Sequence, residues 1–370
     1  TGMRGILPPI QRYIYLYIPL ITMGLMSREY QSGSIKLLYS SPVKNTSIIM
    51  GKFLSMMVYG VVLIGVLGVF VIFSAITIVN FDYPLVLSGM LGLYLLILAY
   101  SAIGLFMSSI TKYQVVAAIG TLAVLAVLNF IGDVGQDYDL VRHITYWLSI
   151  TGRAYPFIDG LVASDNIFYF LIVIGFFLAL SILKLNTEKT IMPLKIKVLK
   201  YSGIIFVILL LGYISSTPYT KYYYDATYTK SNTLAKESQD VIKNLDGDLT
   251  ITTYVNLLDE DLYSGLPRNR NNDFKRFEKY YRFKPDIEMK YVYYYDKAYN
   301  PSLEWRFPNK TFEERVELLC QANNLKRDMF MTPDEIKNII DLTPEHNKFI
   351  RIIERENGQK VYLRMFNDNM

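Results

Sequence analysis

Long uncharged apolar stretches dominate the first 220 residues of this sequence. A helix that crosses a membrane needs about 20 apolar residues, and five stretches reach or approach that length. They are 53–81, 83–111, 113–132, 166–183 and 201–220. A sixth stretch, 13–27, is shorter and contains Pro19, but its alternating tyrosines suit a membrane interface. One such stretch alone is consistent with a buried core helix, whereas five in succession predict a membrane bundle of about six helices.

The positive charges between these stretches fall unequally on the two sides of the expected membrane. If 28–52 is cytoplasmic, the cytoplasmic loops of residues 1–220 hold ten Lys and Arg, and the outer segments hold only four. Cytoplasmic loops of membrane proteins are enriched in Lys and Arg. The asymmetry predicts that 28–52 and 184–200 are cytoplasmic, and that 133–166 and 221–370 lie outside.

Residues 221–370 have the composition of a water-soluble domain. They hold 24 of the 38 Lys and Arg and 25 of the 33 Asp and Glu. The apolar spacing predicts a helix that opens at 232–234 and ends near Gly247, a strand at 249–256, a helix at 272–283, a strand at 287–295, helices at 311–324 and 333–341, and a hairpin of 348–354 and 359–366. The predicted fold class is a membrane all-α bundle followed by an extracytoplasmic α/β domain with a parallel strand pair.

The residue types present exclude several kinds of chemistry. The single cysteine, Cys320, allows neither an intramolecular disulfide nor a cysteine zinc site, and two histidines are too few for a His-rich metal centre. The phosphate-binding loop G-x-x-x-x-G-K-[ST] is missing, because Gly51-Lys52 is followed by Phe53. The five long stretches contain no Asp, Glu, Lys, Arg or His, which argues against ion-coupled transport. We predict no catalytic, cofactor-binding or metal-binding residue and no nucleic-acid partner.

The polar segment that begins at Arg28 and Glu29 is the most informative one in the membrane half. Its apolar residues Ile35, Leu37, Leu38 and Val43 predict a short amphipathic helix that lies on the membrane surface or docks a partner. A loop of this kind, taken alone, is more often a solvated connection.

The order of residues in this segment resembles a known pattern. Residues 28–43 read R-E-x-x-x-G-[ST]-[IL]-x-x-L-x-x-[ST]-P-[VI], and Gly51-Lys52 follows before the next span. This is similar to the coupling segment of type-2 ABC transporter permeases. With the lead-in at 18–23 and the stretch 153–162, it resembles the permease of the gliding-motility-associated ABC transporters of Bacteroidota, over about residues 1–185.

The resemblance implies a multi-pass permease of the bacterial inner membrane, which contacts lipid, forms a dimer with a second permease copy, and is no enzyme itself. A separate cytoplasmic ABC ATPase subunit would hydrolyse ATP. The residues implied to receive the ATPase's motion are Arg28, Glu29, Gly33, Lys36, Leu37, Leu38 and Pro42. Within this set we expect Glu29 to pair with a basic residue of the ATPase, and the two leucines to supply the apolar anchor.

The outer segment 133–166 contains a second group of candidates. The family has short re-entrant or surface helices here, at the exit of the pathway. This makes Tyr146, Trp147, Arg153 and Tyr155 candidates for an outer gate loop. An interfacial helix with a tryptophan anchor and no substrate contact is an equally good interpretation.

The run at 228–255 resembles the start of the extracytoplasmic domain in the auxiliary subunit of the same transporters. The chain then resembles a permease fused to that subunit. The implied parts are a permease domain at 1–184 that lacks its first helix, a cytoplasmic basic linker at 185–200, a membrane anchor at 201–220, and a periplasmic domain at 221–370 that is shorter than the family's version.

Two functions from different classes follow. The first is the permease of an ATP-driven type-2 exporter, with an outer domain that binds substrate or an envelope protein partner. The alternative is a non-transporting envelope complex, related to gliding or secretion, in which ATP-driven motion remodels an outer partner. A continuous polar path through the bundle would favour the first.

Overall fold

The computed structural model describes residues 2–136, 138–190, 192–217 and 220–364, and the chain divides into two compact units. Unit 1 comprises Thr1–Gly132 and Ile144–Thr233, and unit 2 comprises Asp133–His143 and Leu234–Met370. The helical membrane part and the α/β part predicted from the sequence are both present. The fold class is therefore confirmed.

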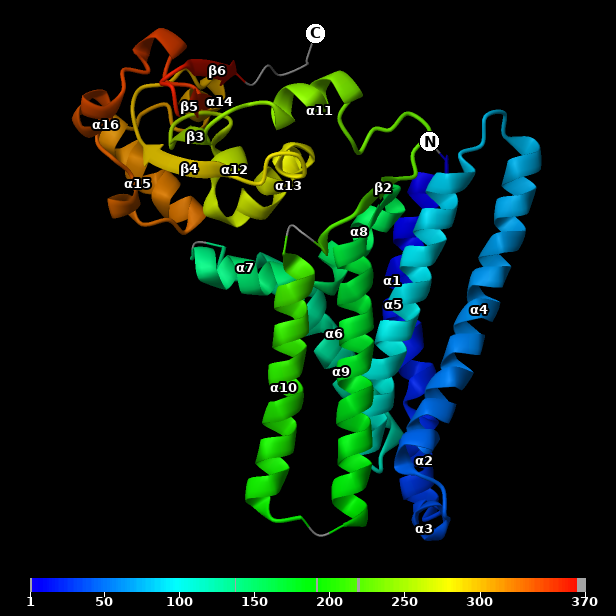
Figure 1. The fold of residues 1–370 in the computed structure, drawn as a ribbon. Coiled ribbons are helices and arrows are strands. Elements are labelled where there is room, and N and C mark those ends of the chain that lie inside the picture. The colour runs from blue at the N-terminus through cyan, green and yellow to red at the C-terminus, as the bar shows by residue number, and fades with distance from the viewer. Residues whose placement is uncertain (1, 137, 191, 218–219, 365–370) are drawn as a thin grey trace. The chain divides into compact units, whose positions relative to one another are not determined.

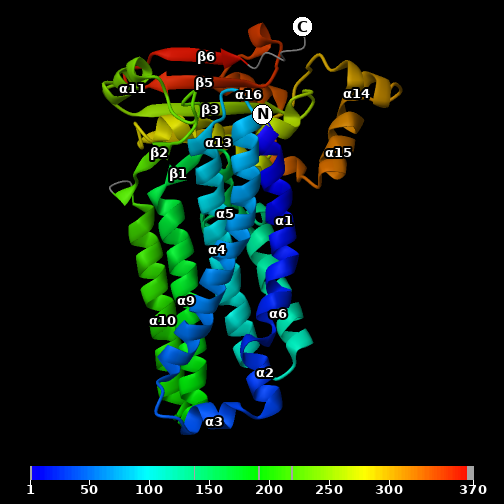
Figure 2. The same ribbon diagram turned by 90° about the vertical axis from the view of Figure 1, so that its right-hand side faces the viewer.

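Unit 1 is a bundle of helices (Figures 1 and 2). Its helices in chain order are α1 (Gly2–Thr22), α2 (Gly24–Ser32), α3 (Ile35–Ser40), α4 (Asn45–Thr77), α5 (Tyr83–Ile110), α6 (Gln114–Phe130), the second half of α7 (Asp139–Leu148), α8 (Ile150–Ile158), α9 (Ser164–Lys189) and α10 (Leu194–Ser216). A short 3-10 turn, Ile131–Asp133, follows α6. Five helices in the described residues are long and apolar enough to cross a membrane, namely α4, α5, α6 with its 3-10 turn, α9 and α10. They coincide with the five long stretches of the sequence.

The sixth predicted span, 13–27, is wrong in its bounds. The helix over this region begins at Gly2 and ends at Thr22, and α2 begins at Gly24 after a turn at Met23. Ser108 of α5 lies at the break: its Oγ accepts hydrogen bonds from the N–H groups of Met26 and Ser27, both at 2.9 Å, and donates to the carbonyl of Met23 at 2.8 Å. A side chain inserted in this way replaces bonds of the helical ladder and bends the chain.

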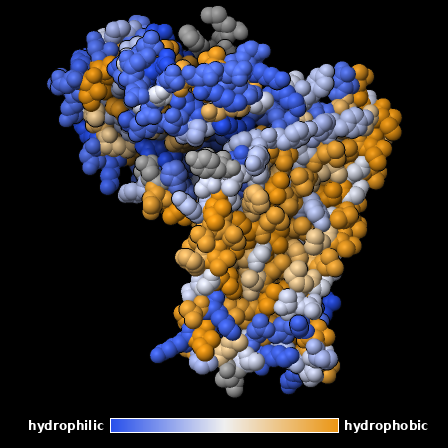
Figure 3. All heavy atoms as spheres, viewed as in Figure 1, coloured by the Kyte–Doolittle hydropathy of each residue, from blue (hydrophilic) through white to orange (hydrophobic). Residues whose placement is uncertain are grey.

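Helix α5 is the most buried of the five, whereas α4 and α10 are mostly exposed. The exposed side chains of α4 are chiefly valine and phenylalanine, as lipid contact requires. Apolar side chains cover the bundle in Figure 3, and hydrophilic ones gather at the end that contains α2 and α3. Gly104 of α5 allows α1 to approach closely, because a Cβ there would lie 2.0 Å from Thr22 Oγ1.

After α10 the chain returns to the end of α8. Strand β2 (Tyr223–Asp225) pairs antiparallel with β1 (Leu161–Ala163). The Asp225 carboxylate accepts hydrogen bonds from the N–H groups of Thr227 at 2.9 Å and Asn232 at 2.7 Å, and the Tyr228 N–H donates to Asp82, the N-cap residue of α5, at 2.9 Å. The segment that leads towards unit 2 is thus fixed to unit 1 at several points.

Unit 2 has a four-stranded sheet in the order β4-β3-β5-β6. The strands are β3 (Leu249–Asn256), β4 (Ile287–Tyr294), β5 (Ile350–Arg355) and β6 (Lys360–Arg364). β3 and β4 are parallel, and β5 and β6 form an antiparallel hairpin, so both predicted pairings are confirmed. Residues 365–366 of the predicted hairpin lie outside the described residues.

The helices of unit 2 are α11 (Lys236–Lys243), α12 (Leu262–Gly265), α13 (Arg270–Tyr281), α14 (Pro301–Arg306), α15 (Phe312–Asn323) and α16 (Pro333–Ile339), with 3-10 turns at Pro267–Asn269, Arg327–Met329 and Thr343–Glu345. α11 is shorter than predicted, because it begins only after Ala235 and ends at Lys243. α15 and α16 both begin with a capping box, in which a threonine and a glutamate three residues later satisfy each other's backbone N–H groups.

A buried ion pair joins α13 to the sheet. The Arg351 guanidinium on β5 contacts both carboxylate oxygens of Asp273, at 2.6 and 2.7 Å, and the two side chains are 3% and 1% exposed. Tyr291 donates a third hydrogen bond to Asp273 at 2.7 Å. Cys320 is buried in the apolar core of this unit, as expected of a small apolar side chain. Residues 133–143 belong to the same unit, where the Arg142 guanidinium stacks 4.4 Å from the Phe274 ring.

Candidate functional site

The coupling segment predicted at 28–42 forms two short helices joined by a glycine turn. α2 ends at Gly33, whose φ of +76° is the left-handed conformation that glycine adopts without strain. α3 follows after Ser34 and ends before Ser41-Pro42, where the residue that precedes a proline is extended. The amphipathic helix expected here is therefore present, but it is only six residues long.

The two sides of α3 differ. Ile35 is 8% exposed and packs into the core of the bundle, and Leu38 and Tyr39 pack against the same core. Leu37, by contrast, is 73% exposed, and Lys36 beside it is exposed as well. Of the two leucines expected to anchor a partner, only Leu37 is available, because Leu38 holds α3 to its own bundle.

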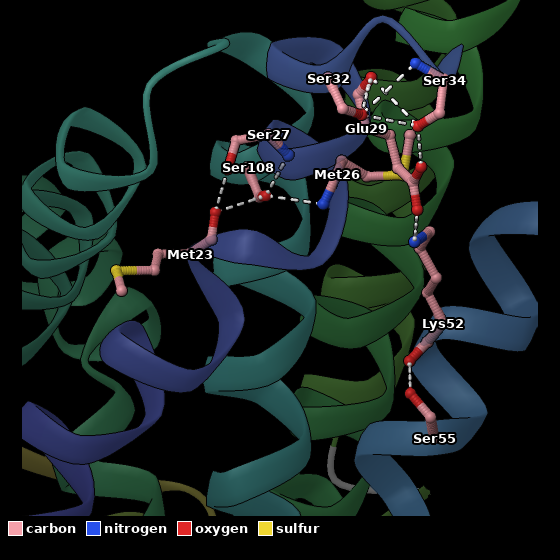
Figure 4. A network of polar contacts seen from close by, with 9 residues as sticks. All are labelled: Met23, Met26, Ser27, Glu29, Ser32, Ser34, Lys52, Ser55 and Ser108. Atoms are coloured by element: carbon pink, nitrogen blue, oxygen red, sulfur yellow. Dashed lines mark hydrogen bonds and ion pairs between the residues drawn. The ribbon is translucent and has the colours of Figure 1, made fainter.

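Glu29 of α2 lies in a polar network with α4 (Figure 4). Its Oε1 pairs with Lys52 Nζ at 3.2 Å, and Ser34 donates a short hydrogen bond to its Oε2. The hydrogen bond from Ser34 is the main cause that lowers the pKa of Glu29; partial burial opposes it, and Lys52 lowers the pKa further. Glu29 thus has a basic partner, Lys52, within its own chain.

The same view shows how α2 is attached to α5. Ser108 holds Met23, Met26 and Ser27 through the three hydrogen bonds described above (Figure 4). Together with Lys52 this fixes α2 to two long helices of the bundle. The remaining predicted residues, Arg28, Gly33 and Pro42, are exposed at the surface of the segment.

Sequence reasoning missed three residues that hold this segment. Tyr30 of α2 and Tyr39 of α3 both donate to Glu188 Oε2 of α9, at 2.5 and 3.0 Å. A signal for Glu188 exists in the sequence, since it and Glu29 are the two acidic residues of 1–220 that fall in segments predicted to be cytoplasmic. An isolated carboxylate among ten basic residues is a candidate for an internal contact.

The structure brings together three of the four predicted gate residues. Arg153 pairs with Asp165 at 3.1 Å and lies over the rings of Tyr146 and Tyr169, 5.4 and 5.7 Å from their centroids. Trp147 packs edge-on against Tyr169, with ring centroids 5.8 Å apart.

Helix α10 packs closely against the same aromatic cluster. A Cβ at Gly212 would lie 2.3 Å from the Trp147 ring, so glycine is required there. The fourth predicted gate residue, Tyr155, has a side chain that is 42% exposed. These contacts tie α7, α8, α9 and α10 together at one end of the bundle.

Comparison with known families bears on the coupling segment directly. Residues 9–136 match the model of the ABC-2 family transporter protein. Residues 9–136, called the ABC-2-like segment below, are roughly a third of the chain. They include α2 to α6 and so contain every predicted coupling residue. The match supports a type-2 ABC permease, a multi-pass membrane component and not a nucleotide-binding domain. No curated protein and no solved structure matches this chain.

Proposed function

We propose that this chain is the permease subunit of an ATP-driven type-2 ABC transporter, and that the segment from Arg28 to Pro42 receives the motion of a separate ATPase. The observation that carries the proposal is α3, which exposes Leu37 and Lys36 on a segment that is fixed to the bundle on its other side. The similarity of 9–136 to ABC-2 transporters supports it independently.

A segment that transmits force must be stiffly attached to what it moves. α2 meets this requirement through Ser108 on α5 and Lys52 on α4, and α3 meets it through the buried Ile35. A solvated connection, the alternative interpretation of this loop, would have neither a buried serine nor a partly buried ion pair. The attachments therefore favour a coupling segment.

The exposed side chains describe the partner surface. Leu37 and Val43 are the exposed apolar side chains between residues 28 and 44, and the basic residues Arg28, Lys36 and Lys44 of the same segment are exposed as well. A complementary ATPase groove has an apolar pocket with an acidic rim. Most of the binding energy would come from the leucine, because buried apolar anchors dominate interfaces and charges at the rim contribute less.

Several finer features belong to the same proposal. The end with α2 and α3 faces the cytoplasm and unit 2 lies outside it, as the Lys and Arg asymmetry indicates. The resemblance to bacterial permeases supports the inner membrane and, for unit 2, the periplasm. Two copies form the complex with two ATPases. The resemblances of 153–162 and 228–255 support a gliding-type transporter of Bacteroidota in which permease and auxiliary subunit are fused.

One observation favours the non-transporting alternative. From Leu93 to Leu105, α5 buries chiefly Leu, Ile and Ala side chains, and Tyr100 and Ser101 are the buried side chains of this stretch that carry a hydroxyl. The fixed segment after α10 would suit transmission of motion to an outer partner. Transport of a polar substrate by the complex would require a path along another face of the bundle, between two copies.

The test is co-purification of the ATPase from membranes of the host that naturally makes this chain. Leu37→Ala should reduce the amount of ATPase bound, because truncation of a buried anchor costs about 1–3 kcal/mol of binding free energy. Leu209→Ala on α10, which truncates another exposed leucine on a helix outside the coupling segment, is the matched control. Equal ATPase retention by the parent and the Leu37 variant would contradict the proposal.

A further inference from the structure

The last turn of α9 is a meeting point for three other helices. Glu188 Oε2 accepts the hydroxyls of Tyr30 on α2 and Tyr39 on α3, and Glu188 Oε1 pairs with Lys184 Nζ at 2.8 Å. Two residues before Glu188, the Asn186 side chain accepts a hydrogen bond from Asn45 Nδ2, at the start of α4, at 2.8 Å. One turn of α9 therefore holds both halves of the coupling segment and the helix that follows it.

α2 and α3 are attached to different helices. The Ser108 hydrogen bonds hold the start of α2 to α5, whereas the Tyr39 hydroxyl of α3 donates to Glu188 of α9 and lies 3.5 Å from the Tyr30 hydroxyl. Gly33 lies between the two helices, and a Cβ there would meet no heavy atom within 4 Å. Only Gly33 and Ser34 separate the two helices, so α3 is attached to the bundle through its own buried Ile35 and through the hydrogen bond from Tyr39 to Glu188.

We infer that Glu188 is a positioning residue that passes a displacement of α3 into α9, and so into the α9–α10 pair that leads along the chain to unit 2. This inference rests on the proposed function, because α3 must first be moved by an ATPase. It also explains why α9, which lies outside the ABC-2-like segment, is held to that segment by hydrogen bonds from three elements.

The chemistry of the contact requires a carboxylate. Two hydroxyl donors converge on one oxygen, and an ammonium occupies the other, so every atom facing Glu188 is a donor. Glutamine at this position can offer an oxygen to the tyrosines only by turning its NH₂ group towards Lys184, where two donors would face each other. Burial is the main cause that raises the pKa values of Tyr30 and Tyr39, which keeps both hydroxyls protonated as donors.

The test is a double-mutant cycle in the complex purified with its own ATPase from host membranes. Glu188→Gln, Tyr39→Phe and the double variant are compared with the parent. Tyr113→Phe removes the hydroxyl of an exposed tyrosine beside α6 and is the matched control. The readouts are the amount of ATPase bound, the KM for ATP, the maximal rate of ATP hydrolysis and the thermal midpoint.

We expect the maximal rate to fall about tenfold in Glu188→Gln, the factor that corresponds to one hydrogen bond to a charged group. The amount of bound ATPase and the KM should stay unchanged, and the double variant should be no slower than Glu188→Gln alone. Tyr113→Phe should match the parent.

Two results would overturn the inference while the proposed function stands. One is an unchanged maximal rate in Glu188→Gln with the ATPase still bound. The other is a loss of bound ATPase and thermal stability in parallel with the rate, which indicates a merely structural role. Absence of any ATPase from the purified parent would instead overturn the proposed function itself, and the inference with it.

Discussion

Glu29 and Lys52 form an ion pair that joins α2 to α4, with 3.2 Å between Glu29 Oε1 and Lys52 Nζ. The two side chains are 31% and 24% exposed, so the pair is screened by water and its Coulomb energy is modest. The pair also links the side of α2 that carries Glu29 to α4. Glu29 therefore positions the coupling segment within the chain, and its expected role as a contact to the ATPase stays a prediction.

The Glu29 pair should weaken in acid. The pKa of Glu29 lies below its ordinary value of 4.5 in the folded chain, so its contribution to stability is complete above that value and is lost as pH falls through the lower, folded pKa. We predict that the thermal midpoint of the parent exceeds that of Glu29→Gln at pH 7, and that the two converge at the acid end of a titration. Thermal unfolding in nanodiscs across this range measures the difference. A difference independent of pH would contradict a contribution from the Glu29 charge.

Ser108 should be among the most sensitive polar residues of the bundle. Replacement by alanine removes the side-chain acceptor of two buried N–H groups, whereas the Met23 carbonyl keeps the Ser27 hydroxyl as a donor. A buried group left unsatisfied costs about 1–3 kcal/mol, reduced by any relaxation of the turn. Ser108→Ala should therefore lower the thermal midpoint clearly. Ser109→Ala is the control, because its hydroxyl donates only to Phe106 within the same helix. If both variants have the same thermal midpoint as the parent, the break at Met23 does not depend on Ser108.

Local patterns predicted unit 2 closely, and distant contacts explain what they missed. The strand at 249–256 was predicted to the residue, because alternating side chains and the flanking Gly247 are local signals. The turn at Met23 was not predicted, since it depends on a serine more than 80 positions away in the sequence. The fusion and gate interpretations rest on resemblance and remain predictions.

In the candidate site, too, local patterns predict some features and distant contacts determine the others. The exposed and buried sides of α3 follow from spacing only if the helix register is known, and a six-residue helix gives too few positions to fix it. Hence Leu37 and Leu38 were assigned the same role, although one is exposed and the other packs on the core. Glu188 joins Tyr30 across 158 positions, and no local pattern reports such a contact.

The Arg351–Asp273 pair should control the stability of unit 2. Removal of one partner leaves a buried charge unpaired, which costs about 3–5 kcal/mol. Arg351→Met should therefore reduce hydrogen-exchange protection of the amides in β3 and β5. Lys290→Met breaks an exposed pair with Glu288 and should leave protection unchanged. The double variant Arg351→Met with Asp273→Leu should recover part of the loss, and equal protection in all variants would contradict a role for the pair.

The orientation of the bundle can be tested by thiol labelling, with Cys320 first replaced by serine so that no native thiol remains. Two exposed positions lie on opposite sides of the predicted membrane: Ser40 at the end of α3, and Tyr228, which is 88% exposed in the segment after β2. The Tyr228 backbone N–H bonds to Asp82, and a cysteine keeps this bond because it involves the main chain. In cells with a permeabilised outer membrane and an intact inner membrane, a membrane-impermeant maleimide should label Tyr228→Cys and not Ser40→Cys. After the inner membrane is disrupted, both should react, which shows that Ser40→Cys is accessible in the folded chain. Labelling of Ser40→Cys alone in intact cells would reverse the topology, place α3 outside the cytoplasm, and remove the basis for an ATPase at the coupling segment.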